Sequence, residues 1–326
     1  MRVVVTGASG FVGGAVARGL VADGHEVWTS SRRDPAVDGA RHLPWDLTTG
    51  PLADPPPVDA VVHAGAAVSD WCALDVARAT NVAGTLAVRD TFPGARFVHV
   101  SSGSVYDPYR PSVRAREHEA PVARYLDAYG STKAEAERAL ARDVARHPDR
   151  GAVVVLRPHA VYGPGDTTLL PRVEAAVRRG RLVLPGGGRP PPSRPPHETP
   201  HAPGRSALRP PEAAARAPGG EGGPTPGWLV ANVADAEPVV LRDALADALR
   251  RRGTAVRVVA VPVRPAWALA GAVETVARRL RRPEPPRLTR YALSHLAMER
   301  TYDLTVLRDV LGVDPPPTSF AGAHAW

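Results

Sequence analysis

Thr6-Gly7-Ala8-Ser9-Gly10-Phe11-Val12-Gly13 follows an apolar run at residues 2–5 and decides the fold of this 326-residue sequence. The β-branched run predicts a buried strand, and the amphipathic pattern through residue 21 predicts a helix. This order predicts a dinucleotide-binding unit: Gly7 permits the tight turn, Gly10 lets the backbone approach a pyrophosphate, and Gly13 lets the helix pack on the strand. The helix N-terminus adds positive potential. We therefore expect the cofactor to contact Gly7, Ser9, Gly10, Phe11, Val12 and Gly13.

The end of the second expected strand, residues 25–30, indicates which dinucleotide binds. NAD sites usually place an acid here to hold the ribose 2′-hydroxyl. This chain has Ser31-Arg32-Arg33, and its first acid, Asp34, comes only after them. Because arginine makes bidentate contacts with phosphate oxygens, we predict NADP(H) rather than NAD(H), read by Ser31 and Arg32.

Three further strands, expected at residues 42–45, 58–63 and 96–100, end beside the same crevice. His63 could be catalytic, but a histidine that ends a strand is more often structural or part of the surface on which the cofactor lies. The expected helix 75–91 carries Asn81, one of two asparagines in the chain. A buried asparagine needs partners, so we expect it to tie loops together. The further cofactor contacts predicted here are Asp46, Leu47, His63, Ala64, Gly65, Ala66 and Asn81.

Tyr129 and Lys133 lie four residues apart on an expected helix that runs to about residue 146, so both can face one site. An adjacent ammonium favours the phenolate form of a tyrosine and brings proton transfer within reach at neutral pH. Lys133 is the only lysine among 41 basic residues. Ser102 follows the strand 96–100, where its hydroxyl can hydrogen-bond a substrate carbonyl; no G-x-S-x-G sequence surrounds it, which disfavours acyl transfer.

Together these segments resemble the extended short-chain dehydrogenase/reductase family, which includes NAD(P)-dependent epimerase/dehydratases and 3β-hydroxysteroid dehydrogenase-like enzymes. The resemblance covers residues 1 to about 188 and resumes near 228. It is carried by Thr6-Gly7-x-x-Gly10-x-x-Gly13, Asp46-Leu47, His63-Ala64-Gly65-Ala66, Asn81-Val82-x-Gly84-Thr85, Ser101-Ser102-x-Ser104-Val105-Tyr106, Tyr129-x-x-x-Lys133 and Arg157-Pro158-x-x-Val161-Tyr162-Gly163-Pro164-Gly165.

The resemblance implies a catalytic set of Ser102, Tyr129 and Lys133, with Tyr129 and Lys133 also contacting the cofactor and Lys133 holding the nicotinamide ribose. It implies hydride transfer between the nicotinamide C4 and a secondary alcohol or ketone, and a homodimer through the helices of Asn81 and Tyr129. A nucleotide-sugar 4-epimerase with the same residues and a non-catalytic NADP-binding protein remain alternatives. Gly103-Ser104 replaces the Asp-Glu pair usual in the family's dehydratases, which disfavours sugar dehydration.

The expected fold is α/β: a Rossmann-type doubly wound parallel sheet with a smaller, mostly helical C-terminal substrate region. Residues 1–165 form the NAD(P)-binding domain, to which residues near 228–262 return, and residues 166–188 and 263–326 form the substrate-binding region. Amphipathic or apolar patterns predict helices at 237–252, 265–280, 290–300 and 304–311, and a strand at 255–261. Trp267, Tyr291 and Leu296 could line a substrate pocket, although core packing is the commoner role.

Residues 189–227 depart from this pattern, because they hold 12 prolines and a single large aliphatic residue, Leu208. Such a stretch cannot bury a core. It is either a natural disordered insertion or the product of two compensating frameshifts in GC-rich DNA, and its composition favours the frameshifts. His197-Glu198-Thr199-Pro200-His201 matches a zinc pattern, but the surrounding prolines forbid the helix that the pattern needs, so we expect no metal.

Bulk properties favour a cytoplasmic protein that binds a small molecule. The net charge of +8 comes from scattered arginines without interleaved aromatics, which disfavours nucleic acid. The single cysteine, Cys72, excludes an internal disulfide. The most apolar later stretch, 255–276, is interrupted by arginine and proline, so we expect no membrane span or membrane partner.

Overall fold

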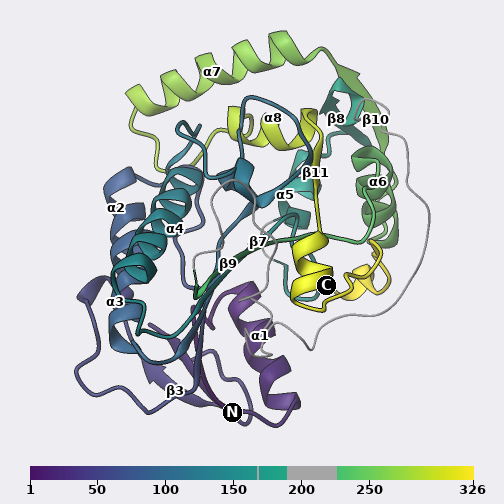
Figure 1. The fold of residues 1–326 in the computed structure, drawn as a ribbon. Helices are drawn as coiled ribbons and strands as arrows, with labels where there is room; N and C mark the ends of the chain where they lie inside the picture. Colours follow the sequence, from purple (N-terminus) through teal and green to yellow (C-terminus); the bar gives the residue numbers. More distant parts are fainter. Residues whose placement is uncertain (167–168, 189–225) are drawn as a thin grey trace.

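The computed structural model describes residues 1–166, 169–188 and 226–326, and a seven-stranded parallel sheet organises them (Figure 1). The strand order is β3-β2-β1-β4-β5-β7-β9, so the order reverses between β1 and β4. This confirms the expected doubly wound sheet. The strands are β1 (Arg2–Thr6), β2 (Glu26–Ser31), β3 (Arg41–Pro44), β4 (Ala60–His63), β5 (Arg96–Val100), β7 (Val153–Pro158) and β9 (Trp228–Val233).

Helices cover both faces of the sheet, because alternate residues of each buried strand point to opposite sides. Val3 and Val5 pack with Leu20 of α1, while Val4 lies in the cluster of Leu140 on the other face. Figure 1 shows α1 on one side of the sheet and the other three helices grouped on the opposite side. These helices are α1 (Phe11–Ala22), α2 (Leu74–Arg78), α3 (Gly84–Thr91) and α4 (Ala128–Arg146).

The helix expected at residues 75–91 is interrupted by a π-helical turn at Ala79–Ala83, between α2 and α3. Asn81 lies in this turn and is fully buried. π-turns inside helices often mark functional sites. Periodicity alone does not reveal this interruption, because an apolar stripe continues across it.

A smaller region lies beyond the carboxyl ends of the strands and contains two short parallel pairs, β8 with β10 and β6 with β11. Its elements are β6 (Ser112–Ala115), α5 (Leu169–Ala176), β8 (Arg181–Pro185), α6 (Leu241–Arg251), β10 (Arg257–Val261), α7 (Val263–Arg279), α8 (Arg290–Ala297) and β11 (Arg300–Tyr302).

Some sequence expectations for this region need correction. The strand expected at 255–261 exists as β10, but it pairs with β8 and not with the main sheet, which only β9 rejoins. The helix expected at 290–300 ends at Ala297, because the following residues pair as β11 with the distant β6. A π-helical turn at Val306–Val310 replaces the short helix expected at 304–311.

Most of the proline-rich stretch, residues 189–225, lies outside the described residues, and so does the zinc-like pattern at 197–201. Within the described ranges, no group of three His, Cys, Asp or Glu side chains could hold a metal ion. No helix in those same ranges is long and apolar enough to cross a membrane.

Candidate active site

The turn after β1 meets the turn after β4 where the strand order reverses. Gly7 has φ +69°, and a Cβ on it would lie 2.5 Å from the Gly65 Cα. Only glycine fits this conformation and this contact. A Cβ on Gly13 would lie 2.4 Å from the Gly7 carbonyl oxygen, which confirms the expected close packing of helix on strand.

The N-terminus of α1 points into this crevice without a capping side chain, and its first turn contains no acidic residue. Its first backbone N–H groups therefore suit an anion. A Cβ on Gly163 or on Gly165, both in the loop after β7, would lie 3.8 Å from the Phe11 ring, so this loop lies against the start of α1. The glycine cradle and the uncapped helix fit a dinucleotide pyrophosphate.

The residues proposed to read the adenosine ribose lie at the end of β2. Ser31 is buried, and its Oγ donates a 2.6 Å hydrogen bond to the Arg33 carbonyl, while Arg32 is exposed. Asp46 caps the turn after β3 by accepting from Thr48 N at 3.0 Å. Hydrogen bonds from Thr48, and more weakly the charge of Arg32, lower the pKa of Asp46.

The side chain of His63 has a structural role in the core. The ring is fully buried, and its Nδ1 and Nε2 lie 2.6 Å and 2.9 Å from the hydroxyls of Thr6 and Thr85. Burial, and secondarily the charge of Lys133, lower the pKa of His63 to about 3. Both nitrogens are occupied, so only the backbone of His63 remains for the proposed cofactor contact, and the structural role is the better interpretation of its ring.

Asn81 ties the loop after β4 to α4, as expected for a buried asparagine. Its Oδ1 accepts from Ala67 N at 2.7 Å, and its Nδ2 donates to the Ala67 carbonyl at 3.2 Å and to Thr132 Oγ1 at 2.9 Å. These bonds fix the β4 turn relative to the helix that carries Tyr129 and Lys133.

Ser102 and Tyr129 come from different elements, and the Ser102 hydroxyl lowers the pKa of the Tyr129 phenol. Close packing of α4 on the loop after β5 makes this possible. A Cβ on Gly130 would lie 2.9 Å from the Ser104 carbonyl oxygen, so glycine is needed beside Tyr129. Asp127 caps the helix by accepting from Gly130 N at 2.9 Å.

Lys133 is 2% exposed and donates from Nζ to the Val100 carbonyl at 2.7 Å, at the end of β5. Burial lowers the pKa of Lys133 to about 8, while the negative charge of Glu137 acts in the opposite direction. An ammonium has three N–H donors, so Lys133 has hydrogens left for a cofactor ribose.

The protonation of Tyr129 differs from the sequence expectation, in which the ammonium favours a phenolate. Burial raises the pKa of Tyr129, the Ser102 hydroxyl opposes that rise, and the charge of Asp127 adds to it. Burial likewise raises the pKa of Asp127 to about 6. The phenol therefore holds its proton at neutral pH, which suits a proton donor.

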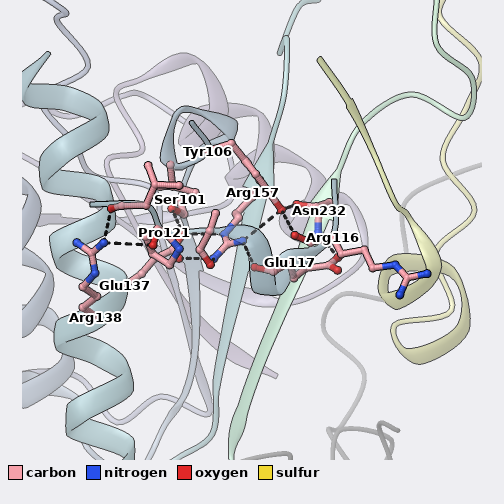
Figure 2. A network of polar contacts seen from close by, with 12 residues as sticks. Ser101, Tyr106, Arg116, Glu117, Pro121, Glu137, Arg138, Arg157 and Asn232 are labelled. Atoms are coloured by element: carbon pink, nitrogen blue, oxygen red, sulfur yellow. Dashed lines mark hydrogen bonds and ion pairs between the residues drawn. The ribbon is translucent and has the colours of Figure 1, made fainter. Parts of the chain in front are cut away.

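A buried network that sequence reasoning missed supports this site (Figure 2). Glu137 accepts from Ser101 Oγ at 2.5 Å and from two guanidinium nitrogens of Arg157, at 3.0 Å and 2.7 Å. Arg157 also donates to Tyr106 Oη at 3.3 Å, and Tyr106 donates to Asn232 Oδ1 at 2.7 Å. The network thus joins α4, β5, β7 and β9. In the sequence, the residue that could have indicated this network is Glu137, which lies four residues after Lys133 and on the same helical face.

The C-terminal region reaches the site through Tyr291, whose Oη lies 3.0 Å from Ser104 Oγ. Leu296 packs in a hydrophobic cluster, as the core-packing role predicts. Trp267 lies with its ring 6.5 Å from that of Tyr109, and neither is placed against Ser102 by a contact. Of these three candidates, Tyr291 is the one whose hydroxyl lies within hydrogen-bond distance of a side chain beside Ser102.

The parallel sheet, the glycine turn and the side chains gathered beside it define a dinucleotide-binding α/β protein. The model of the NAD dependent epimerase/dehydratase family matches residues 3–191, and the chain belongs to that family. The family resemblance inferred from the sequence motifs is thereby confirmed.

Several relatives of known name are reductases, and others are dehydrogenases. The chain is 36% identical over 203 residues to the 2-alkyl-3-oxoalkanoate reductase of Stenotrophomonas maltophilia (strain K279a), covering 58% of this chain and only 59% of that protein's length. It is 27% identical over 328 residues to the 2-alkyl-3-oxoalkanoate reductase of Shewanella oneidensis, covering 94% and 81%. A solved UDP-galactose 4-epimerase superposes with a TM-score of 0.65 at 20% identity over 100% of this chain and 97% of that one, which shows the shared fold.

Proposed function

We propose that this protein is an NADP-dependent reductase that converts a ketone to a secondary alcohol. The observation that carries the proposal is the convergence of a protonated Tyr129, Ser102 and Lys133 beside a crevice shaped for a dinucleotide. When bound, a reduced nicotinamide supplies the hydride for the carbonyl carbon. The protein must then orient the ketone and supply a proton to its oxygen.

Tyr129 is the proposed proton donor, because its raised pKa keeps the phenol protonated until negative charge develops on the ketone oxygen. Ser102 donates a hydrogen bond to the same oxygen and so stabilises that charge. Lys133, fixed by Val100, is proposed to donate to the nicotinamide ribose. The direction of the Tyr129 pKa shift favours reduction over alcohol oxidation at neutral pH.

The preference for NADP(H) is proposed from Arg32. This residue directly follows β2, its side chain is exposed, and its charge acts on Asp46. Ser31 contributes through the backbone, since its hydroxyl is already bound to the Arg33 carbonyl. The remaining cofactor contacts proposed are those predicted from the sequence, on the turns after β1, β3 and β4 and at Asn81.

For the domains, we propose that residues 1–165 with β9 bind the cofactor and that residues 166–188 and 263–326 bind the substrate. The homodimer through the helices of Asn81 and Tyr129 remains a prediction. The names of the relatives suggest a ketone at the 3-position of an acyl chain as the substrate class.

The test is incubation of the purified protein with NADPH deuterated at C4 of the nicotinamide and with ethyl 2-methyl-3-oxobutanoate. We expect the deuterium on the carbinol carbon of the product and stoichiometric loss of NADPH absorbance. In a parallel incubation with a nucleotide sugar and NADP⁺, inversion of the sugar hydroxyl without net cofactor reduction would instead indicate the 4-epimerase. Tight NADPH binding without turnover over a panel of 3-oxo esters would indicate a non-catalytic binding protein.

A further inference from the structure

A line of three hydrogen-bonded hydroxyl groups runs from α8 to Ser102. Tyr291 Oη lies 3.0 Å from Ser104 Oγ, and Ser104 Oγ lies 3.1 Å from Ser102 Oγ. Ser102 Oγ also accepts from Ser104 N at 3.1 Å, and Ser102 lowers the pKa of Tyr129. Tyr291, from a distant part of the chain, is thus joined to Ser102 through Ser104.

The number of protons in this line fixes its direction during reduction. Ser102 has one hydroxyl proton, and a ketone oxygen bound at the site needs that proton as its hydrogen bond. The bond between the hydroxyls of Ser102 and Ser104 then remains only if the Ser104 hydroxyl is its donor. Ser104 has no proton left for Tyr291, so Tyr291 must donate to Ser104. Each bond in such a directed chain strengthens the next.

We propose that Tyr291 and Ser104 are positioning residues that aim the Ser102 proton at the substrate oxygen, so that α8 completes the active site. The inference rests on the proposed ketone reductase function and deepens it. It gives Ser104 and Tyr291 roles that act through Ser102, without contact to the reacting atoms.

The surroundings of Tyr291 hold its hydroxyl in place. Thr289 caps α8 by accepting from Ala292 N at 3.1 Å. The next residue, Arg290, forms an ion pair with Glu274 of α7 at 2.9 Å. The ring of His295 contacts Tyr291 edge-on, with centroids 4.7 Å apart. Burial raises the pKa of Tyr291, so the phenol keeps the proton that it must donate.

The experiment compares Tyr291→Phe, Ser104→Ala and the double variant in NADPH-dependent reduction of ethyl 2-methyl-3-oxobutanoate. Tyr125→Phe is the matched control, because its hydroxyl donates to the Val105 carbonyl at 2.9 Å and not to Ser102. One neutral hydrogen bond corresponds to roughly 2- to 10-fold in kcat. We expect such a loss in each single variant, with KM changed less than kcat, and none in the control.

Three results separate positioning from a general structural effect. Ser104→Thr, which keeps the hydroxyl, should restore kcat to near the wild-type value. The double variant should be no slower than the slower single variant, because both changes break the same line. In a Ser102→Ala background, Tyr291→Phe should change nothing further. Losses that multiply, or persist without Ser102, would overturn the proposal.

A second readout does not need turnover. The ionisation of Tyr129 is measured by ultraviolet absorbance, recorded by stopped flow immediately after a pH jump. The absorbance of the wild type and of Tyr291→Phe is each compared with that of the same protein carrying Tyr129→Phe, and the difference is the titration of Tyr129. In the proposed directed line the Ser102 proton is left for Tyr129, whose pKa Ser102 lowers. Without Tyr291 as a donor, that proton is expected to stay in the bond with Ser104, so the phenol should titrate at higher pH. An unchanged titration would refute the hydrogen-bonded line. If the wild-type protein reduces no ketone but the titration shifts, the proposed function fails while the line of hydroxyls stands.

Discussion

The carboxylate of Glu137 and the guanidinium of Arg157 lie 2.7 Å apart, and each side chain is only 2% exposed. Glu137 stands one helical turn after Lys133, and its other hydrogen-bond partner is Ser101, the neighbour of Ser102. A single buried ion pair thus fixes both sides of the proposed catalytic site. Such a pair has a large desolvation cost, so it is expected to determine position more than to add stability.

Glu137→Gln should destabilise the fold by about 3–5 kcal/mol, because it leaves the Arg157 guanidinium buried without its counter-charge. The measurement is the free energy of unfolding in a denaturant titration. Glu135→Gln on the same helix is the control: its pair with Arg78 is exposed and should matter by less than about 1 kcal/mol. Equal losses in the two variants would show that the buried pair has no special role.

Buried histidines should make the protein sensitive to acid. The folded pKa of His63, about 3, lies below the ordinary value of 6.5, so its contribution to stability is complete above pH 6.5 and is lost as the pH falls toward 3. Stability should therefore decline below pH 6.5, with His63 contributing up to about 1.4 kcal/mol per pH unit. Unfolding titrations of His63→Asn should show a shallower slope over this window. The exposed His118→Asn should keep the wild-type slope, and an unchanged slope in His63→Asn would contradict the prediction.

Arg32→Ala should raise KM for NADPH by about 10- to 100-fold, because a charge-assisted contact with the 2′-phosphate is lost. KM for NADH should stay within about threefold, since NADH lacks that phosphate. Arg33→Ala is the neighbouring control and should have the smaller effect. Steady-state kinetics with both cofactors decide the matter: an unaltered preference in Arg32→Ala would remove the basis for assigning NADP(H).

Gly130→Ala should lower kcat by about 10- to 100-fold while leaving the protein folded, because a displacement near 1 Å is enough to misalign Tyr129. The added Cβ would lie 2.9 Å from the Ser104 carbonyl oxygen and 3.2 Å from the Tyr125 ring. Gly19→Ala in α1 provides the control, since nothing lies within 4 Å of the added atom. Circular dichroism and kcat are measured together, and a Gly130→Ala enzyme of normal activity would refute the tight packing.

The main sheet was predictable because its strands are apolar runs and its first turn has a required glycine order. β1 and β5 lie within one residue of their expected bounds, and α4 ends at the expected residue 146. In contrast, β6 and β11 pair residues as distant as Ser112 and Arg300, and neither segment has enough periodicity to predict a strand alone. Their formation depends on the assembled fold.

The proposed catalytic residues could be found because their spacing places them on one helical face or at the end of one strand. The buried partners could not. Glu137 and Arg157 are charged residues, which usually lie in solvent, and only their tertiary contact explains their burial. Tyr291 was recognised merely as a pocket or core candidate, because no local pattern shows that α8 lies against Ser104.

Tyr129→Phe tests the central claim most directly, with kcat for NADPH-dependent reduction of ethyl 2-methyl-3-oxobutanoate measured beside the Kd for NADPH. Loss of the proton donor should reduce kcat by about 10²- to 10⁴-fold, while the Kd for NADPH changes by less than about threefold. Tyr125→Phe should match the wild type in both. A Tyr129→Phe protein that turns over within about threefold of the wild-type rate would contradict the assignment of Tyr129 as the acid.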